Sequence, residues 1–303
     1  MEERYRSLNG YFRERFGGKV YKLALDGGMT CPNRDGTAGT EGCIFCHGGA
    51  GEFAERGEDI VKQIERAKAR VARKTKENRY VAYFQSYTNT YAPVCKLNHM
   101  FSEAINCPEI VALSIATRPD CLPDDVTALL AELNEKKPVF VELGLQTVHE
   151  KTAKLIRRGY PLPVFDEAIK KLREKKLETI VHVILGLPHE SAEDMLKTVR
   201  YVGESGADGI KLQLLHVLRG TALEKMYENG KFSTLSRGEY IDILCRCIEA
   251  LPPRIVIHRL TGDAPKRLLV APAWSADKKA VLNEIRAELE RRNVVQGKNF
   301  ERK

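Results

Sequence analysis

Short apolar runs rich in β-branched residues alternate along the chain with segments that repeat apolar residues at helical spacing. Six runs predict buried β-strands, over residues 20–25, 79–85, 110–115, 138–145, 179–185 and 209–215. The segments between and after them predict amphipathic helices, over residues 59–76, 94–105, 123–136, 163–175, 191–204 and 221–229. Capping boxes are indicated by Ser191 with Asp194 and by Ser236 with Glu239. The alternation predicts an α/β fold whose parallel strands are joined by right-handed crossovers.

Two architectures share this pattern, a doubly wound sheet and an open, partial (β/α) barrel. In either, ligands bind at the carboxyl ends of the strands. The rhythm changes near residue 251, where turn signals and one further strand precede a charged helix over residues 276–292. We therefore expect an N-terminal extension (1–19), a core (20–250) and a C-terminal extension (251–303).

Three of the eight cysteines, Cys31, Cys43 and Cys46, lie in the loop that follows the first predicted strand. Eight cysteines in 303 residues are too sparse for a disulfide scaffold, so this grouping indicates metal binding or catalysis. Three glycines between the first two cysteines let such a loop fold tightly around a bulky inorganic centre. The other five cysteines are expected to be packing thiols.

The cysteine loop has three interpretations. Three thiolates on a four-iron, four-sulfur cluster leave one iron without a protein ligand, as a catalytic site requires. A structural zinc held by the same cysteines and His47 fits the spacing equally well. The third interpretation is three unrelated thiols. The position after the first strand favours the cluster, and Phe45 offers an apolar platform for a stacked base.

The net charge of +8 is unevenly distributed. Residues 62–79 hold eight basic and two acidic side chains, and residues 251–303 hold twelve basic and six acidic ones, so each segment carries +6. Such segments suggest a polyanionic partner, with nucleic acid first, or two solvated helix faces. Aromatic residues interleave with charge and suit base stacking: Tyr83, Phe84, Tyr87, Tyr91 and Trp274.

The start of the chain is charged throughout, and no apolar stretch reaches the roughly 18 residues of a membrane helix. We therefore expect a cytoplasmic protein with no membrane partner.

The motifs together resemble the radical S-adenosylmethionine (SAM) superfamily. The resemblance rests on CPNRDGT with GC-x-FC, TRPD (117–120), ELGLQT (142–147), GLPHES (186–191) and HRLTGDAP (258–265). Within the superfamily these motifs are similar to the YhcC/YtqA branch, which is related to the elongator catalytic subunit. The resemblance implies a partial (β/α)6 TIM-like barrel with both extensions, and a [4Fe-4S] cluster on Cys31, Cys43 and Cys46.

The resemblance also implies contacts with SAM, by comparison with coproporphyrinogen oxidases of the same superfamily. Gln146 matches a glutamine at the SAM ribose, and Arg158 matches an arginine at the SAM carboxylate. Gly186 matches a turn that lies against the adenine.

Two positions depart from that pattern. Ser86 or Thr88 stands where the superfamily usually has glycines at the SAM amino group. His182 stands where those oxidases have a ribose-binding aspartate.

The implied activity is reductive cleavage of SAM to a 5′-deoxyadenosyl radical, with an electron from a donor such as flavodoxin or ferredoxin. The branch is associated with tRNA wobble-uridine modification, at the step from 5-carboxymethylaminomethyluridine to 5-aminomethyluridine. Two alternatives remain open, a radical SAM enzyme for a small metabolite or porphyrin-like ligand, and a non-enzymatic metal-binding module in an RNA-associated complex.

Overall fold

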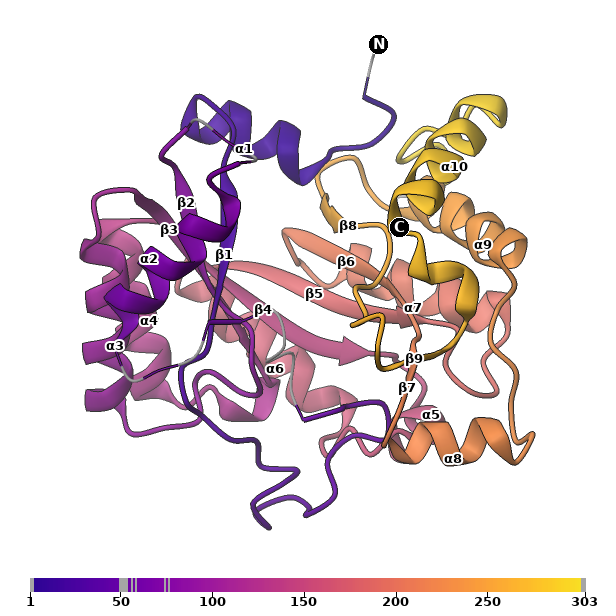
Figure 1. The fold of residues 1–303 in the computed structure, drawn as a ribbon, viewed down its shortest axis with the longest axis horizontal. Coiled ribbons are helices and arrows are strands. Elements are labelled where there is room, and N and C mark those ends of the chain that lie inside the picture. The colour runs from indigo at the N-terminus through magenta and orange to yellow at the C-terminus, as the bar shows by residue number, and fades with distance from the viewer. Residues whose placement is uncertain are drawn as a thin grey trace.

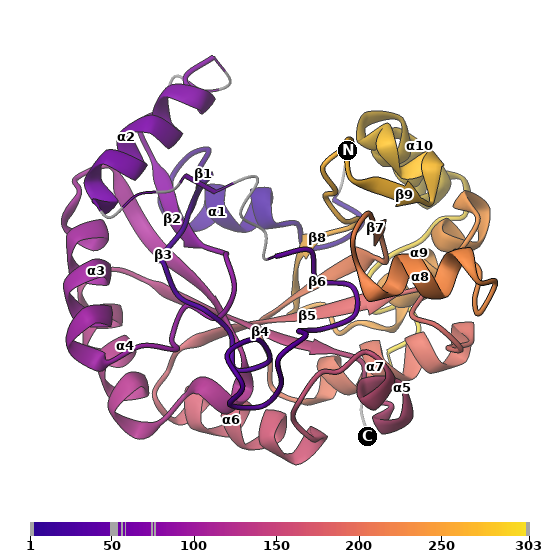
Figure 2. The same ribbon diagram turned by 60° about the horizontal axis from the view of Figure 1, so that its bottom comes forward.

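A single curled sheet of seven parallel strands organises the computed structural model, which describes residues 3–48, 54–55, 57, 59–73, 75 and 77–300. Its strands are β1 (Tyr21–Leu25), β2 (Tyr80–Phe84), β3 (Ile110–Thr117), β4 (Val139–Gln146), β5 (Glu178–Leu185), β6 (Gly209–Leu214) and β8 (Val256–Arg259). Figure 2 shows the strands curling into a half-barrel with helices around its outer side. The strands follow one another in chain order, so no strand order reverses as it would in a doubly wound sheet. The partial barrel is confirmed.

Helices cover the convex side of the sheet (Figure 1). They are α2 (Ile60–Val71), α3 (Val94–Asn106), α4 (Asp124–Lys136), α6 (Leu162–Glu174), α7 (Ala192–Glu204) and α9 (Arg237–Ala250). Both predicted capping boxes form: Ser191 accepts from the Asp194 N–H, and Ser236 accepts from the Glu239 N–H. The helices bury one apolar stripe each, so α2 places Ile60 against the sheet side while its basic residues face outward.

Residues after 250 complete the sheet. Strand β8 pairs with β6, and helix α10 (Lys278–Arg291) packs on α9. A small antiparallel pair joins β7 (Val217–Leu218) to β9 (Leu269–Ala271). The short elements are α5 (Glu150–Leu155), α8 (Ala222–Glu228) and two 3-10 turns (Pro119–Cys121 and Ala273–Ala276).

Helix α1 (Leu8–Phe16) closes the amino-terminal end of the half-barrel. It begins at Ser7, whose side chain accepts from the Gly10 N–H, and Phe12 is buried against the sheet. The residues that pack with Phe12 come from five strand regions: Val20, Val81, Ala112, Phe140 and Ile180. With this end sealed, ligands reach the interior from the opposite end. Within the described residues, no helix combines the length and apolar character that a membrane span requires.

Candidate functional site

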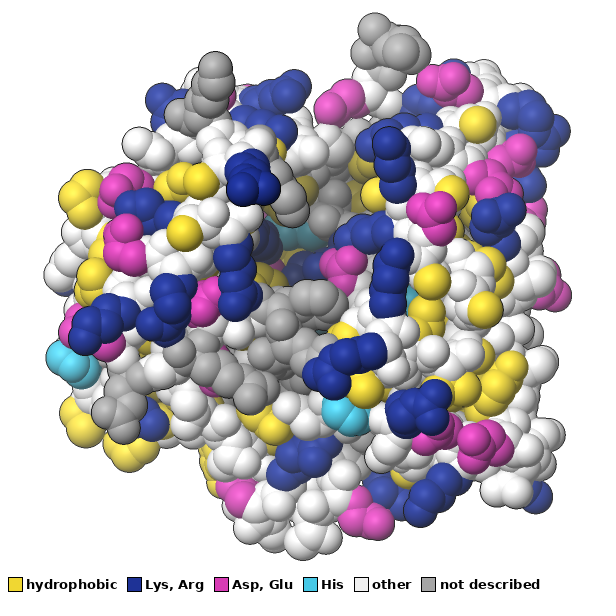
Figure 3. Space-filling model, viewed as in Figure 1, with side chains coloured by type: hydrophobic (Ala, Val, Ile, Leu, Met, Phe, Trp, Pro, Cys, Tyr) yellow, Lys and Arg dark blue, Asp and Glu magenta, His cyan; other side chains and the backbone are white. Residues whose placement is uncertain are grey.

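A cavity of about 780 Å³ runs from the carboxyl ends of the strands into the half-barrel. This volume lies in the usual range of small-molecule sites. Figure 3 shows Lys and Arg side chains gathered around a hollow near the centre of one face, with further basic side chains visible inside it. The loop after β1 forms one wall of the cavity, and strands β4, β5 and β6 form the facing wall.

The cysteine loop brings Cys31, Cys43 and Cys46 to this cavity. The Cys46 N–H donates to the Cys43 carbonyl oxygen at 3.0 Å, and the Arg34 guanidinium donates to the Cys46 carbonyl oxygen at 2.7 Å. Asn33 ties the loop to the turn after α5, because its Nδ2 donates to the Arg157 carbonyl oxygen at 2.7 Å and lies 3.5 Å from the Cys43 Sγ. The loop is therefore held by polar contacts that leave the thiols facing the cavity.

The spacing of these thiols separates the two metal interpretations. Among the described side chains, no group of three or more His, Cys, Asp or Glu is close enough to hold a single metal ion. Tetrahedral zinc with Zn–S bonds of about 2.3 Å would need ligand sulfurs roughly 3.8 Å apart. A cluster accepts wider spacing, because each cysteine binds a different iron. Three thiols at the cavity wall suit an iron–sulfur cluster, whereas the cysteines and His47, which also lines the cavity, are not grouped closely enough for one zinc ion.

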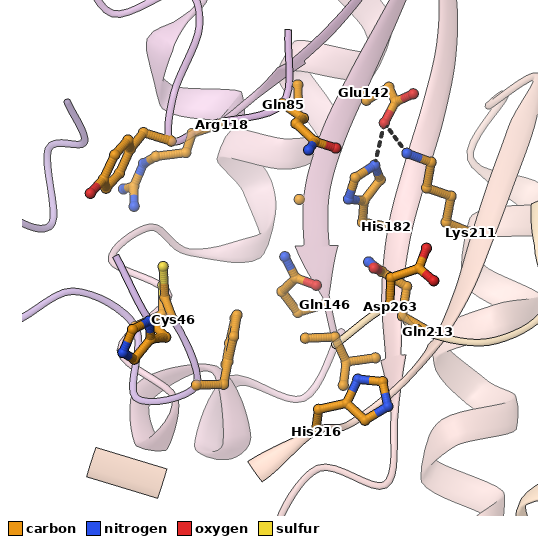
Figure 4. Close-up of a pocket in the computed structure, with 18 of the residues that line it drawn as sticks. Cys46, Gln85, Arg118, Glu142, Gln146, His182, Lys211, Gln213, His216 and Asp263 are labelled. Atoms are coloured by element: carbon orange, nitrogen blue, oxygen red, sulfur yellow. Dashed lines mark hydrogen bonds and ion pairs between the residues drawn. The ribbon is translucent and has the colours of Figure 1, made fainter. Parts of the chain in front are cut away.

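Gln146 ends β4 with its side chain in the cavity (Figure 4). Its backbone φ is +67°, in the left-handed region that non-glycine residues rarely adopt. The side-chain Oε1 is buried and has no hydrogen-bond partner among the described residues. A buried amide oxygen without a partner is costly, so a hydroxyl-bearing ligand suits this position.

Arg158 has a different surrounding from the one predicted. Its side chain is 2% exposed, and the guanidinium donates to backbone carbonyl oxygens and to Glu150. The accepting carbonyls belong to Tyr160 (2.9 Å), Leu145 (3.3 Å) and Thr147 (2.6 Å). These bonds hold the backbone on both sides of Gln146. Most donors of Arg158 are therefore engaged in structure, which favours a positioning role over a grip on the SAM carboxylate.

The other predicted SAM contacts divide into two groups. Phe45 and Thr88 line the cavity. Ser86 and Gly186 do not: Ser86 is fully buried behind the wall, and Gly186 packs against Leu235. Ser86 lies in a bend directly after β2, and its side chain is turned into the protein rather than into the cavity. Contacts of Ser86 and Gly186 with SAM stay predictions.

His182 lies on the wall opposite the cysteines (Figure 4). Its Nε2 is 2.7 Å from Glu142 Oε2. Burial, together with the positive charge of Lys211, lowers the pKa of His182 to about 4, so the ring is neutral near pH 7. A contact between His182 and the SAM ribose stays a prediction.

Only some of the aromatic residues expected to suit base stacking line the cavity. Tyr83 and Tyr87 line the cavity, whereas Phe84 is fully buried against Phe101 in the core. Trp274 packs on Tyr240 and donates to the Leu235 carbonyl oxygen. Tyr91 bonds to Thr37 outside this cavity. Stacking by Phe84 or Trp274 was therefore a wrong expectation. The packing role of Cys95 was also wrong, because this thiol is exposed.

Sequence reasoning missed a ring of polar side chains inside the half-barrel. Each of the seven strands contributes one: Lys22, Tyr83, Ser114, Glu142, His182, Lys211 and His258. The signal was present as polar residues that interrupt the apolar runs of the strands, such as Glu142, His182 and Lys211. Apolar strands accommodate a charge only when it is paired or serves a site, so these interruptions were informative.

Comparison with known proteins identifies the family. The profile described as "Radical SAM superfamily" matches residues 34–202, and a "Radical_SAM C-terminal domain" profile matches residues 207–291. The chain belongs to the radical SAM superfamily. It is 48% identical over 303 residues to YtqA of Bacillus subtilis, covering 99% of this chain and 94% of YtqA. It is 38% identical over 268 residues to YhcC of Escherichia coli, covering 88% of this chain and 86% of YhcC.

The fold of this radical SAM protein is also seen in a distant solved structure. Elp3 of Methanocaldococcus infernus, with an N-terminal deletion, superimposes with a TM-score of 0.71 at 17% identity, covering 91% of this chain and 64% of that one. The protein is a radical SAM enzyme whose cofactors are a [4Fe-4S] cluster and SAM. Its chemistry requires an external reductant.

Proposed function

We propose that Cys31, Cys43 and Cys46 hold the cluster and that the enzyme acts on a wobble uridine of tRNA, at the step from 5-carboxymethylaminomethyluridine to 5-aminomethyluridine. When bound, the cluster supplies the electron that cleaves SAM and yields a 5′-deoxyadenosyl radical. The three cysteines and Gln146 line the same cavity, and the unpartnered amide oxygen of Gln146 supports a contact with the SAM ribose.

The proposal of an RNA substrate rests on the side chains at the mouth of the cavity. The Arg34 guanidinium lies 5.9 Å from the centre of the Tyr87 ring, and both side chains line the cavity. An arginine over an aromatic ring gives a flat, cationic surface on which an unpaired base stacks beside its phosphate. Basic side chains gathered around the hollow extend this surface (Figure 3).

The basic segment of residues 62–79 offers fewer unpaired cations to an RNA than its net charge suggests. Most described cations of residues 62–79 pair with carboxylates: Lys62 with Asp59, Arg66 and Arg70 with Glu55, Lys68 with Glu65 and Glu109, and Arg79 with Glu77. We therefore place the RNA contact at the cavity mouth rather than along α2.

Nucleoside mass spectrometry of tRNA tests the proposed function. In a host that carries this gene, its deletion should deplete 5-aminomethyluridine and its derivatives and accumulate 5-carboxymethylaminomethyluridine. Complementation with the wild-type gene should restore the profile, and the Cys43→Ala variant should not. An unchanged profile after deletion would remove the tRNA proposal and favour a small-molecule substrate. Binding of purified protein to tRNA should also weaken steeply with added salt.

A further inference from the structure

Glu142 lies at the centre of the polar ring and is fully buried. Its Oε1 accepts hydrogen bonds from Lys22 Nζ at 2.7 Å and from Ser114 Oγ at 2.6 Å. Its Oε2 accepts from His182 Nε2 at 2.7 Å and from Lys211 Nζ. Four donors therefore saturate this carboxylate, and Figure 4 shows two of these contacts facing the cavity. Although burial alone would raise the pKa of Glu142, Lys211 and Lys22 hold it well below the usual range.

The ring contains more positive than negative charge. Two ammonium groups share the single carboxylate of Glu142, and both lie against the Tyr83 ring, at 4.8 Å for Lys22 and 4.6 Å for Lys211. Tyr83 does not balance them, because burial and Glu142 raise its pKa well above 10. The next carboxylate, Asp263, does not balance them either, because it pairs with Arg259 at 3.2 Å and with Lys278. Burial lowers the pKa of Lys211 to about 7, so below that pH the two ammonium groups leave one positive charge of the ring uncompensated.

Hydrogen-bond donors are also left over. Each ammonium group has three N–H donors. Lys22 uses two, to Glu142 and Ser114 (3.2 Å), and Lys211 uses two, to Glu142 and the Tyr83 hydroxyl (3.0 Å). Within the described part of the chain, the buried Nδ1 of His258 has no partner. Lys22, Lys211 and His258 all line the cavity that a ligand would enter.

We propose that Lys22 and Lys211, with His258 beside them, form a binding site for the carboxylate group of the substrate. A carboxylate carries one negative charge, which matches the uncompensated charge, and two oxygens, which match the two spare ammonium donors. Glu142 is a positioning residue that holds both ammonium groups at the site. This inference deepens the proposed function. It rests on that function only for the identity of the substrate that bears the carboxylate.

A purely structural ion pair explains the ring less well. Burying a charge is costly unless it is paired, and one lysine is enough to neutralise Glu142. A second buried lysine adds a desolvation cost whenever it is charged, and among the described residues of the ring no second carboxylate compensates it. The carboxylate of a bound substrate supplies that anion, and it also anchors the substrate at a fixed depth opposite the cysteines.

Ligand-detected NMR on the reconstituted full-length protein with SAM tests the site. The probes are N-methylglycine, which carries a carboxylate beside a secondary amine, its neutral amide, and inorganic phosphate. We expect N-methylglycine to bind at least about tenfold more tightly than the amide and more tightly than phosphate. Equal binding of acid and amide, or a preference for phosphate, would overturn the carboxylate site.

The variant Lys22→Met should reduce N-methylglycine affinity by about tenfold, and Lys22→Arg should restore most of it. This substitution leaves Glu142 bonded to Lys211, Ser114 and His182, so the fold is preserved and urea denaturation can verify it. Lys62→Met, on the exposed face of α2, is the matched control. Undiminished binding in a folded Lys22→Met variant would contradict the proposal.

The two proposals fail separately. The binding experiment contains no RNA, so an unchanged tRNA profile removes the RNA substrate without touching the carboxylate site. Conversely, loss of 5-aminomethyluridine on gene deletion, combined with equal binding of acid and amide, retains the proposed function and removes this site.

Discussion

The guanidinium group of Arg158 donates a 2.6 Å hydrogen bond to the carbonyl oxygen of Thr147, one residue beyond Gln146. A second bond, to the Leu145 carbonyl oxygen, secures the other side of Gln146. The left-handed backbone of Gln146 is thereby held in place, and its amide faces the cavity. The buried guanidinium of Arg158 thus shapes the cavity by fixing the backbone on both sides of Gln146.

Replacing Arg158 by methionine should destabilise the fold by about 3 kcal/mol, because three buried carbonyl oxygens lose a charged donor. Urea denaturation of the cluster-free protein measures this loss. The matched control is Arg157→Met, which removes only a surface ion pair with Glu41 and should cost less than about 1 kcal/mol. Unchanged stability of Arg158→Met, with a large loss of SAM affinity, would instead support a direct grip on the SAM carboxylate.

Replacing Gln146 by alanine should weaken SAM binding by about tenfold, since one hydrogen bond to a ligand hydroxyl is worth about 1 kcal/mol or somewhat more. Equilibrium dialysis with labelled SAM on the reconstituted protein measures the affinity. Gln213→Ala, which removes the same amide from β6, should have a smaller effect. Equal losses in the two variants would show that Gln146 has no special place at SAM.

Replacing Cys43 by alanine should abolish the visible absorbance of the cluster and reductive SAM cleavage, because one of three thiolate ligands is lost. The fold should persist, since Cys43 lies in a loop outside the strands and helices. Iron content, absorbance and release of 5′-deoxyadenosine measure these outcomes. Cys95→Ala, an exposed thiol on α3, should retain all three. SAM cleavage by the Cys43→Ala variant would contradict the ligand assignment.

Carboxylate binding should weaken as the pH rises through about 7. Burial lowers the pKa of Lys211 to about 7, so this ammonium group is charged below that pH and loses its proton above it. The charged and titratable groups that face it are Lys22, Tyr83, Glu142, His182, His258 and Arg259. Tyr83 stays neutral and Glu142 stays ionised between about pH 6 and pH 8.5 because their pKa values lie far outside that range.

The measurement is N-methylglycine affinity as a function of pH in wild type and in Lys211→Met. The wild-type affinity should fall with rising pH, whereas the variant should bind weakly with little pH dependence. Affinity that rises with pH in the wild type would exclude Lys211 as the titrating group.

Local sequence patterns determined the elements of this protein and the chemistry of one loop. Apolar runs predicted six strands, and a seventh, β8, forms from the single further strand expected after residue 251, where the apolar run 255–257 leads into it. The helices began where Ser191 and Ser236 cap them, since capping depends on residues three apart. Cys31, Cys43 and Cys46 were recognisable because their spacing lies within a single loop.

The tertiary structure alone decided which side chains meet inside the half-barrel. Lys22, Glu142 and Lys211 are separated by more than a hundred residues along the chain at their widest, and only the curl of the sheet brings their charges together. The same holds for Arg158, whose partners became visible only once the backbone of β4 was in place. Hydrogen bonds and ion pairs depend on distances of a few ångströms between remote residues, and local spacing in the sequence carries no information on those distances.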